Sequence, residues 1–162
     1  MSSAKQRLLR LSIAHYRSQN VSEEAFHRWA AEDHCARAAG IHARHGVEAY
    51  GMLFNLTATR EAARELNERL GKKWVLDDHD VVVEFYLRDL EAVQRIIADP
   101  EFAKLQEEEA PWVDTERSDG GVVAHLAWVE VYVENGKVVH VGSDGKPTYA
   151  RLDLGASLIP VV

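Results

Sequence analysis

The stretch LLRLSIAHYRSQNVSEEAFHRWAAEDHCARAAGI, residues 8–41, predicts a strand, a turn and a long helix, and this unit decides the fold. Apolar and polar residues alternate over residues 8–16, which is the period of a strand. One face of that strand carries Leu9, Leu11, Ile13 and His15. Residues 18–20 read Ser-Gln-Asn, a sequence that favours a turn before the helix.

The long helix is predicted to begin after Ser22, a suitable N-cap, and to run to about His45, with Gly46 placed to end it. Its apolar stripe carries Ala30, His34, Ala38 and Ile41, with Phe26 at the edge. His34 therefore faces the interior, since this stripe is the side that a globular protein buries. We expect the strand and the helix to form two walls of a binding pocket.

Three more strands and three more helices are predicted downstream. The strands cover residues 47–55, 81–87 and 122–133, and the helices cover residues 57–73, 90–98 and 100–112. Asn135-Gly136 then predicts a two-residue hairpin turn, with residues 137–141 as the returning strand. The tail beyond residue 148 has no clear period.

This order of elements predicts an α+β fold, a ferredoxin-like split β-α-β with helices on one face of a four-stranded antiparallel sheet. We expect one domain over residues 1–162, with a core of about 8–133 and a C-terminal extension of 134–162 that carries an added hairpin. The face without helices would leave Val82 and either Val122 or Val123 exposed to water. A second copy packed sheet to sheet would cover it, so a homodimer with the form of a dimeric α+β barrel is expected.

Composition restricts the partners. The net charge is −7, which argues against nucleic acid or an anionic membrane because both need a basic face. Cys35 is the one cysteine, so an intrachain disulfide is impossible. The chain also lacks an apolar signal core and an apolar run long enough to span a membrane. We expect a soluble cytoplasmic protein that binds a small molecule.

The candidate site is a set of histidines and tyrosines that the assumed topology brings together. We expect the first and third strands to be parallel neighbours and the fourth to run antiparallel beside the first. That arrangement places His125 near His15 and Tyr16, puts Phe85 and Tyr86 at the same edge, and puts His79 at the opposite end. The candidate catalytic residues are then His15, His34 and His125, and the candidate substrate-binding walls are Tyr16, Tyr50 and Tyr86.

A histidine on an apolar face is desolvated, which disfavours its charged form and leaves it available as a base near neutral pH. The alternative is a core histidine whose ring nitrogens are satisfied by the backbone or a neighbour. His42 and His45 lie one turn apart and resemble a metal pair, but they point in different directions from His34. The chain also lacks a nucleophile elbow, a P-loop and a dinucleotide fingerprint, so neither a metal nor a cofactor is expected.

Several short motifs together resemble the EthD-type branch of the dimeric α+β barrel proteins. They are Tyr16-Arg17, SEEAFHRW at 22–29, His34, His45-Gly46, Asn55 with Thr59-Arg60, Asp78-x-Asp80, Asp99-Pro100 and DTERS at 114–118. Their order and spacing cover roughly residues 8–133 and are similar to the fungal polyketide-pathway members of that family.

The resemblance implies a cofactor-independent lyase of polyketide metabolism that decarboxylates an aromatic or pre-aromatic polyketide carboxylic acid. His125 or His34 would supply the proton, and Tyr16 or His15 would orient the substrate. A cyclase or dehydratase on the same barrel and a non-catalytic dimer that binds a small molecule remain alternatives. An enzyme should enclose a cavity of a few hundred cubic ångströms with at least two polar side chains, whereas a scaffold should fill that space itself.

Overall fold

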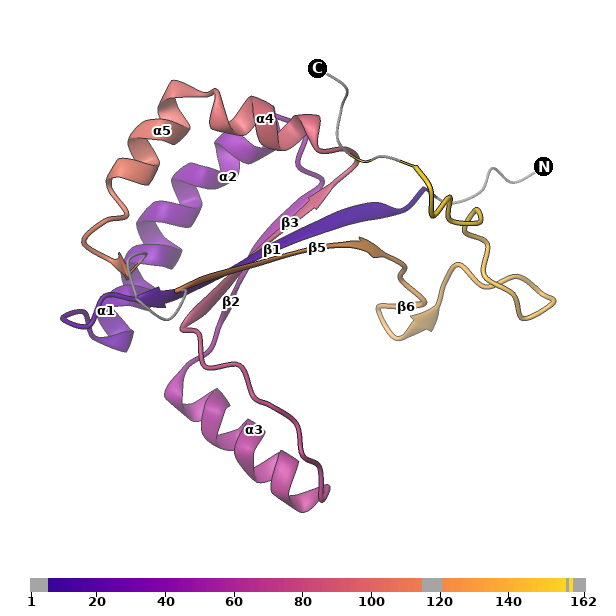
Figure 1. The fold of residues 1–162 in the computed structure, drawn as a ribbon, viewed down its shortest axis with the longest axis horizontal. Helices are drawn as coiled ribbons and strands as arrows, with labels where there is room; N and C mark the ends of the chain where they lie inside the picture. Colours follow the sequence, from indigo (N-terminus) through magenta and orange to yellow (C-terminus); the bar gives the residue numbers. More distant parts are fainter. Residues whose placement is uncertain (1–5, 115–120, 157, 159–162) are drawn as a thin grey trace.

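The computed structural model describes residues 6–114, 121–156 and 158 (Figure 1). The strands are β1 (Leu8–Arg17), β2 (Ala49–Phe54), β3 (Val81–Leu87), β4 (Val113–Asp114), β5 (Val122–Val129), β6 (Val133–Glu134) and β7 (Lys137–Val138). The helices are α1 (Glu23–Arg28), α2 (Cys35–Arg44), α3 (Thr57–Arg69), α4 (Glu91–Ile97) and α5 (Pro100–Glu107). A π-helical turn, η1 (Trp29–His34), joins α1 to α2.

The main sheet has the strand order β2-β3-β1-β5, and β4 pairs with the end of β1. Every neighbouring pair is antiparallel. The α1–η1–α2 segment crosses from β1 to β2, which run in the same direction, and β3 returns between them. The predicted ferredoxin-like split β-α-β is therefore confirmed.

The predicted parallel pairing of β1 and β3 is wrong, because β3 returns from β2 and so runs opposite to β1. His79, which precedes β3, consequently lies beside the end of β1, with its ring centroid 4.3 Å from that of Tyr16. Phe85 and Tyr86 lie towards the other end, paired with Leu11 and Arg10.

β5 ends at Val129 and is shorter than the predicted strand of residues 122–133. β1 begins at Leu8, which pairs with Val129, so the residues after Val129 have no strand of the main sheet beside them. The predicted hairpin follows as β6 and β7, with positive φ at both Asn135 (51°) and Gly136 (73°). Two positive φ values in a two-residue loop are the mark of a type I′ turn.

The long helix begins as predicted, with Ser22 Oγ accepting a hydrogen bond from the Ala25 N–H at 3.1 Å. It ends at Arg44, with His45 as the C-cap and Gly46 next, whose φ of 87° lies in the left-handed region. The sequence pattern missed η1, in which the Cys35 N–H donates to the Ala30 carbonyl five residues earlier. Such wider turns are rare and occur frequently at functional sites.

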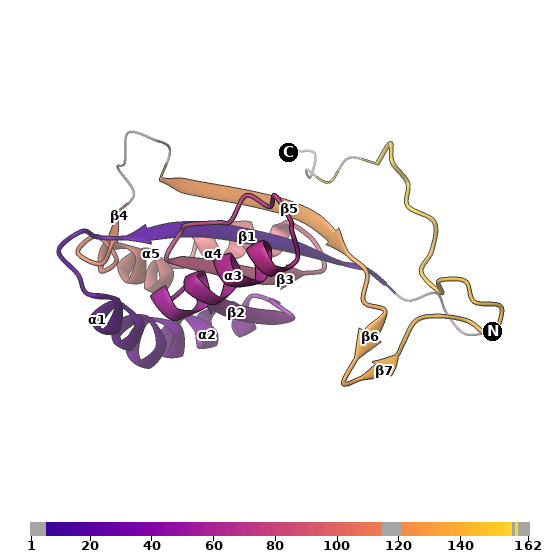
Figure 2. The ribbon, with the colours of Figure 1, turned by 90° about the horizontal axis from the view of Figure 1, so that it is seen from below.

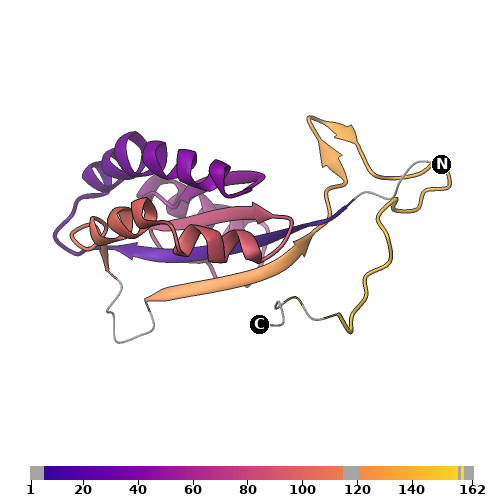
Figure 3. The same cartoon turned by 90° about the horizontal axis from the view of Figure 1, so that it is seen from above.

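The core lies between one face of the sheet and the helices α1, α2, α4 and α5, as Figures 2 and 3 show. The opposite side, which we call the open face, carries Arg10, Ser12, Ala14, Val82, Glu84, Val123 and His125. Val123 is 52% exposed there, as the pattern predicts. Helix α3 projects away from the sheet and has no buried residue (Figure 1). Within the described residues, no helix is both long and apolar enough to cross a membrane.

Candidate active site

A cavity of about 130 Å³ lies between the helix-covered face of the sheet and the helices; we call it the His34 cavity. Its polar lining residues are His15, His34, His42, Tyr50, Gln106 and Glu109. Its apolar walls include Phe26, Trp29, Phe85 and Phe102. None of the described residues that line it is a lysine or an arginine. This volume is smaller than the few hundred cubic ångströms expected for the cavity of an enzyme. The second expectation is met, because more than two polar side chains line the cavity.

His34 and Glu109 form the closest polar pair of this cavity, with 3.3 Å between His34 Nε2 and Glu109 Oε1. The side chain of His34 is 8% exposed and that of Glu109 is 27% exposed, which places Glu109 at the mouth. Burial raises the pKa of Glu109 to about 7. Burial, with the charge of Arg37 next, lowers the pKa of His34. Just below pH 7 the pair is therefore mainly a carboxylic acid beside a neutral imidazole rather than an ion pair.

An aromatic stack holds the two partners together. Trp29 in η1 stacks on Trp112 with 5.0 Å between ring centroids and 2° between ring planes. Trp29 also lies 5.0 Å from the His34 ring. The Glu109 carbonyl accepts hydrogen bonds from the N–H groups of Trp112 (2.8 Å) and Val113 (3.0 Å), so the stack fixes the turn that carries Glu109.

His42 is the most deeply buried histidine of the cavity, at 2% exposure. Burial is the main reason that its pKa falls to about 4, with His34 and His45 contributing. The prediction did not include His42 as a catalytic or substrate-binding residue, although it follows the stripe of His34, Ala38 and Ile41 at a helical spacing. Glu109 was also missed, because the acidic run that contains it is typical of a solvated helix end.

His15 and Tyr50 complete the polar wall. Burial lowers the pKa of His15, and His79 and His34 lower it further. The Tyr50 hydroxyl donates to Cys35 Sγ at 3.8 Å, and burial strongly raises the pKa of that hydroxyl. The structure thus brings three of the six predicted site residues, His15, His34 and Tyr50, to one cavity.

The other three, His125, Tyr16 and Tyr86, lie on the open face, so the expected convergence of His125 with His15 and His34 is wrong within one chain. His125 pairs with Ser12, and paired residues share a face of the sheet. Ser12 and His15 are an odd number of residues apart and so point to opposite faces. Tyr86 pairs with Arg10 on that same open face, and its hydroxyl donates to Glu84 Oε2 at 3.0 Å.

The two histidines of the possible metal pair point to different surroundings. His42 lies in the cavity, whereas His45 Nε2 lies 2.6 Å from Asp99 Oδ2. Within the described ranges, the one His, Cys, Asp and Glu group compact enough for a metal ion is Asp77, Asp78 and His79. It lies outside the His34 cavity.

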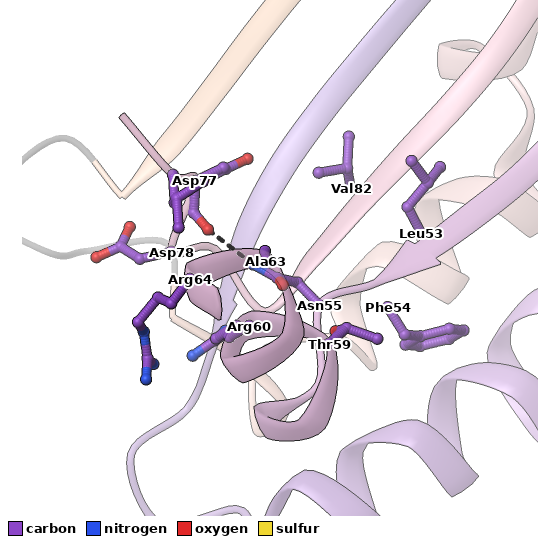
Figure 4. A pocket seen from close by; sticks show the side chains of 11 residues that line it. Leu53, Phe54, Asn55, Thr59, Arg60, Ala63, Arg64, Asp77, Asp78 and Val82 are labelled. Carbon is purple, nitrogen blue, oxygen red and sulfur yellow. Dashed lines mark hydrogen bonds between the residues drawn. The ribbon is translucent and has the colours of Figure 1, made fainter. Parts of the chain in front are cut away.

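A second, larger space of about 500 Å³ lies between α3 and the edge of the open face; we call it the α3 groove (Figure 4). Leu53 and Val82 line it from the sheet, and Thr59 and Ala63 line it from α3. Asn55 closes its base by donating to the backbone carbonyls of residues 77 and 79, both at 2.9 Å.

The loop below the α3 groove is held by the EthD-like motifs. Asp80 Oδ1 lies 2.8 Å from Arg60 Nη2, and Asp80 Oδ2 accepts from the Arg17 N–H at 2.9 Å. These contacts tie α3 and the end of β1 to the start of β3. Residues 115–118 of the DTERS motif lie outside the described residues.

Comparison with known proteins identifies the class. The fold is an α+β ferredoxin-like sheet, and residues 18–116 match the model of the EthD domain. The chain belongs to the EthD domain family.

Its relatives carry the names of several enzymes. A protein of Aspergillus terreus named "Putative oxygenase" is 44% identical over 140 residues, covering 86% of this chain and 85% of that protein. The "Conidial pigment biosynthesis dehydratase EthD" of Metarhizium robertsii is 30% identical, covering 83% of this chain and 91% of that protein. A Claviceps purpurea protein named "Decarboxylase" is 25% identical, covering 80% of this chain and 88% of that protein. A hypothetical Arabidopsis thaliana protein of known structure is 14% identical with a TM-score of 0.48, covering 83% of this chain and 97% of that chain.

Proposed function

We propose that this chain is a cofactor-independent lyase that decarboxylates an aromatic or pre-aromatic polyketide carboxylic acid. The observation that carries the proposal is the 3.3 Å contact between His34 and Glu109 inside a cavity whose described lining residues include no lysine or arginine. The name of the Claviceps purpurea relative supports the reaction, and the pigment-biosynthesis name of the Metarhizium robertsii relative supports a role in secondary metabolism.

The chemistry needs one proton, and Glu109 carries it below about pH 7. Glu109 protonates the ring carbon that bears the carboxylate, the carbon–carbon bond breaks, and its electron pair restores the aromatic ring as CO₂ leaves. The product takes the proton, and Glu109 regains one from water at the mouth. The described lining residues, which include no lysine or arginine, give the carboxylate no ion pair, so they do not stabilise the ground state against reaction.

The cavity size limits what enters. A volume of about 130 Å³ is close to that of an engineered cavity of about 150 Å³ that binds benzene. One ring of the substrate therefore fits inside, and the remaining rings extend through the mouth beside Glu109. His15 lines the same space and is positioned to orient the ring.

The same pair suits the reactions named for two other relatives. A neutral His34 can take a proton while Glu109 protonates a departing hydroxyl, which is the dehydration that the Metarhizium robertsii name describes. The 44% identical relative is named an oxygenase. If this chain catalysed such a reaction, His34 would deprotonate an activated ring carbon. Molecular oxygen would then oxidise the resulting carbanion. The three reactions differ in what is released or consumed.

Purified protein should be incubated with a panel of hydroxylated aromatic carboxylic acids while CO₂, product mass and dissolved oxygen are followed together. Release of one CO₂ per product supports the proposal. A mass loss of one water without CO₂ assigns a dehydratase or cyclase, and oxygen uptake without CO₂ assigns an oxygenase. Saturable binding without any of these leaves a non-catalytic binding module.

We also propose a homodimer in which the open face and α3 of one copy pack against a second copy. Leu66 of α3 and Leu70 at its C-cap are 50% and 51% exposed, and Leu53 beside the α3 groove is 49% exposed. An amphipathic helix gains most of its stability from burying its apolar face, and no residue of α3 is buried within this chain.

A further inference from the structure

His42 is buried without a hydrogen-bond partner. It is 2% exposed, and its Nδ1 atom is buried with no partner. Among the described residues, neither of its ring nitrogens is hydrogen-bonded. Buried polar groups are satisfied in the large majority of cases, so an unsatisfied imidazole needs a specific reason.

The aromatic side chains around this ring do not hydrogen-bond it. The ring centroids of Tyr50, Phe85 and Phe102 lie 4.5, 5.0 and 5.6 Å from that of His42. The two phenylalanines have no hydrogen-bonding atom, and the Tyr50 hydroxyl is directed to Cys35 Sγ. The missing partner must therefore come from whatever fills the cavity that His42 lines.

The environment also selects the kind of partner. An aromatic box without charged groups disfavours an ion, because a buried charge needs a counter-charge. A neutral imidazole offers one donor and one acceptor, and so does a hydroxyl group on an aromatic ring. Since His42 is 2% exposed and the Glu109 side chain 27% exposed, this hydroxyl would lie deeper than the reacting group.

We infer that His42 is a specificity-determining residue that hydrogen-bonds a phenolic hydroxyl on the ring held in the His34 cavity. The inference rests on the proposed function only in taking this cavity as the substrate site. It narrows the substrate class to a ring with a free hydroxyl on its buried edge. Sites built to bond a hydroxyl discriminate strongly against analogues that lack it.

The test compares phenol with toluene, which have nearly the same shape and differ by a hydroxyl in place of a methyl group. Dissociation constants for both are measured by NMR titration on the wild-type chain, on His42→Phe and on the control variant Glu107→Gln. Phenylalanine keeps the ring and its packing and removes both nitrogens. The measurement needs no turnover, so it stands whether or not the decarboxylase proposal holds.

The inference predicts that the preference for phenol over toluene falls at least tenfold in His42→Phe and stays within threefold of wild type in Glu107→Gln, whose side chain is exposed on α5 and does not line the cavity. An unchanged preference in a His42→Phe chain that still binds toluene would overturn it and leave water as the partner of His42. If His42→Phe does not fold, the wild-type chain decides through the ¹⁵N signals of the His42 ring. These signals must move on addition of phenol more than on addition of toluene, and equal movement overturns the inference.

Discussion

His34 Nε2 and Glu109 Oε1 lie 3.3 Å apart at the mouth of an apolar cavity, and burial moves their pKa values towards a neutral pair. Just below pH 7 a mainly protonated carboxylic acid therefore lies beside a neutral imidazole. A glutamic acid side chain in water would be ionised at this pH, so it is burial in the cavity that keeps Glu109 protonated.

The raised pKa of Glu109 predicts how stability depends on pH. Its folded-state pKa of about 7 exceeds the ordinary 4.5, so the folded chain holds a proton that the unfolded chain releases. Stability from this group is complete below about pH 4.5 and is lost as the pH rises through 7. Between pH 5 and 8 the free energy of unfolding of the wild-type chain, measured with denaturant, should fall by on the order of 1–3 kcal/mol relative to that of Glu109→Gln. A ¹³C titration of the Glu109 carboxyl with a midpoint near 4.5 would contradict this.

His42 gives the opposite pH dependence. Its pKa is lowered to about 4, so its contribution is present above about pH 6.5 and is lost as the pH falls through 4. Replacing it by phenylalanine removes an unsatisfied buried group, which is often neutral or stabilising. His42→Phe should therefore match the wild-type free energy of unfolding at pH 7 and exceed it by about 2–3 kcal/mol near pH 4. The matched control is His125→Phe, which makes the same substitution on the open face, outside the His34 cavity.

The Trp29–Trp112 stack should act on activity through Glu109. In Trp112→Leu the turn that carries Glu109 loses its anchor, so we expect a stability loss of about 1–3 kcal/mol and roughly tenfold lower kcat. The Glu109 pKa should also fall towards its ordinary value as the carboxyl gains water. Trp128 is 39% exposed and belongs to β5, so Trp128→Leu serves as the control. An unchanged Glu109 titration in Trp112→Leu would show that the stack does not position the acid.

Helix α3 allows a direct test of the dimer. A double change of Leu66 and Leu70 to aspartate should give a monomer by light scattering while circular dichroism stays nearly unchanged, because neither side chain is buried in this chain. Leu154 in the extension is 92% exposed and gives the control variant Leu154→Asp. A dimer that persists in the double variant would rule out α3 as part of the interface.

The sequence predicts the elements well because alternation, capping residues and glycines act locally. Ser22, Gly46 and Asn135-Gly136 each occupy the position that their chemistry favours. The direction of β3 relative to β1 is a property of the connection and not of either strand, and the mistaken direction misplaced His79 and Phe85.

The candidate site could be predicted only in part. His15 and His34 follow from periodicity, since a strand face and a helix stripe are visible in the sequence. Glu109 could not be found in this way, because it belongs to a turn and is brought to His34 by the stacking of Trp112 on Trp29. His125 was assigned to the wrong face because the pairing register of β5 with β1 cannot be read from either strand alone.

The central claim is that Glu109 donates the proton in the His34 cavity, and the most direct measurement is CO₂ release by Glu109→Gln beside Glu107→Gln. Both variants remove one carboxylate, but Glu107 is exposed on α5 and lines no described pocket. With an aromatic carboxylic acid that the wild type decarboxylates, Glu109→Gln should lower kcat by about 10²–10⁴, and Glu107→Gln should keep the wild-type rate. Equal CO₂ release by the two variants would contradict the account.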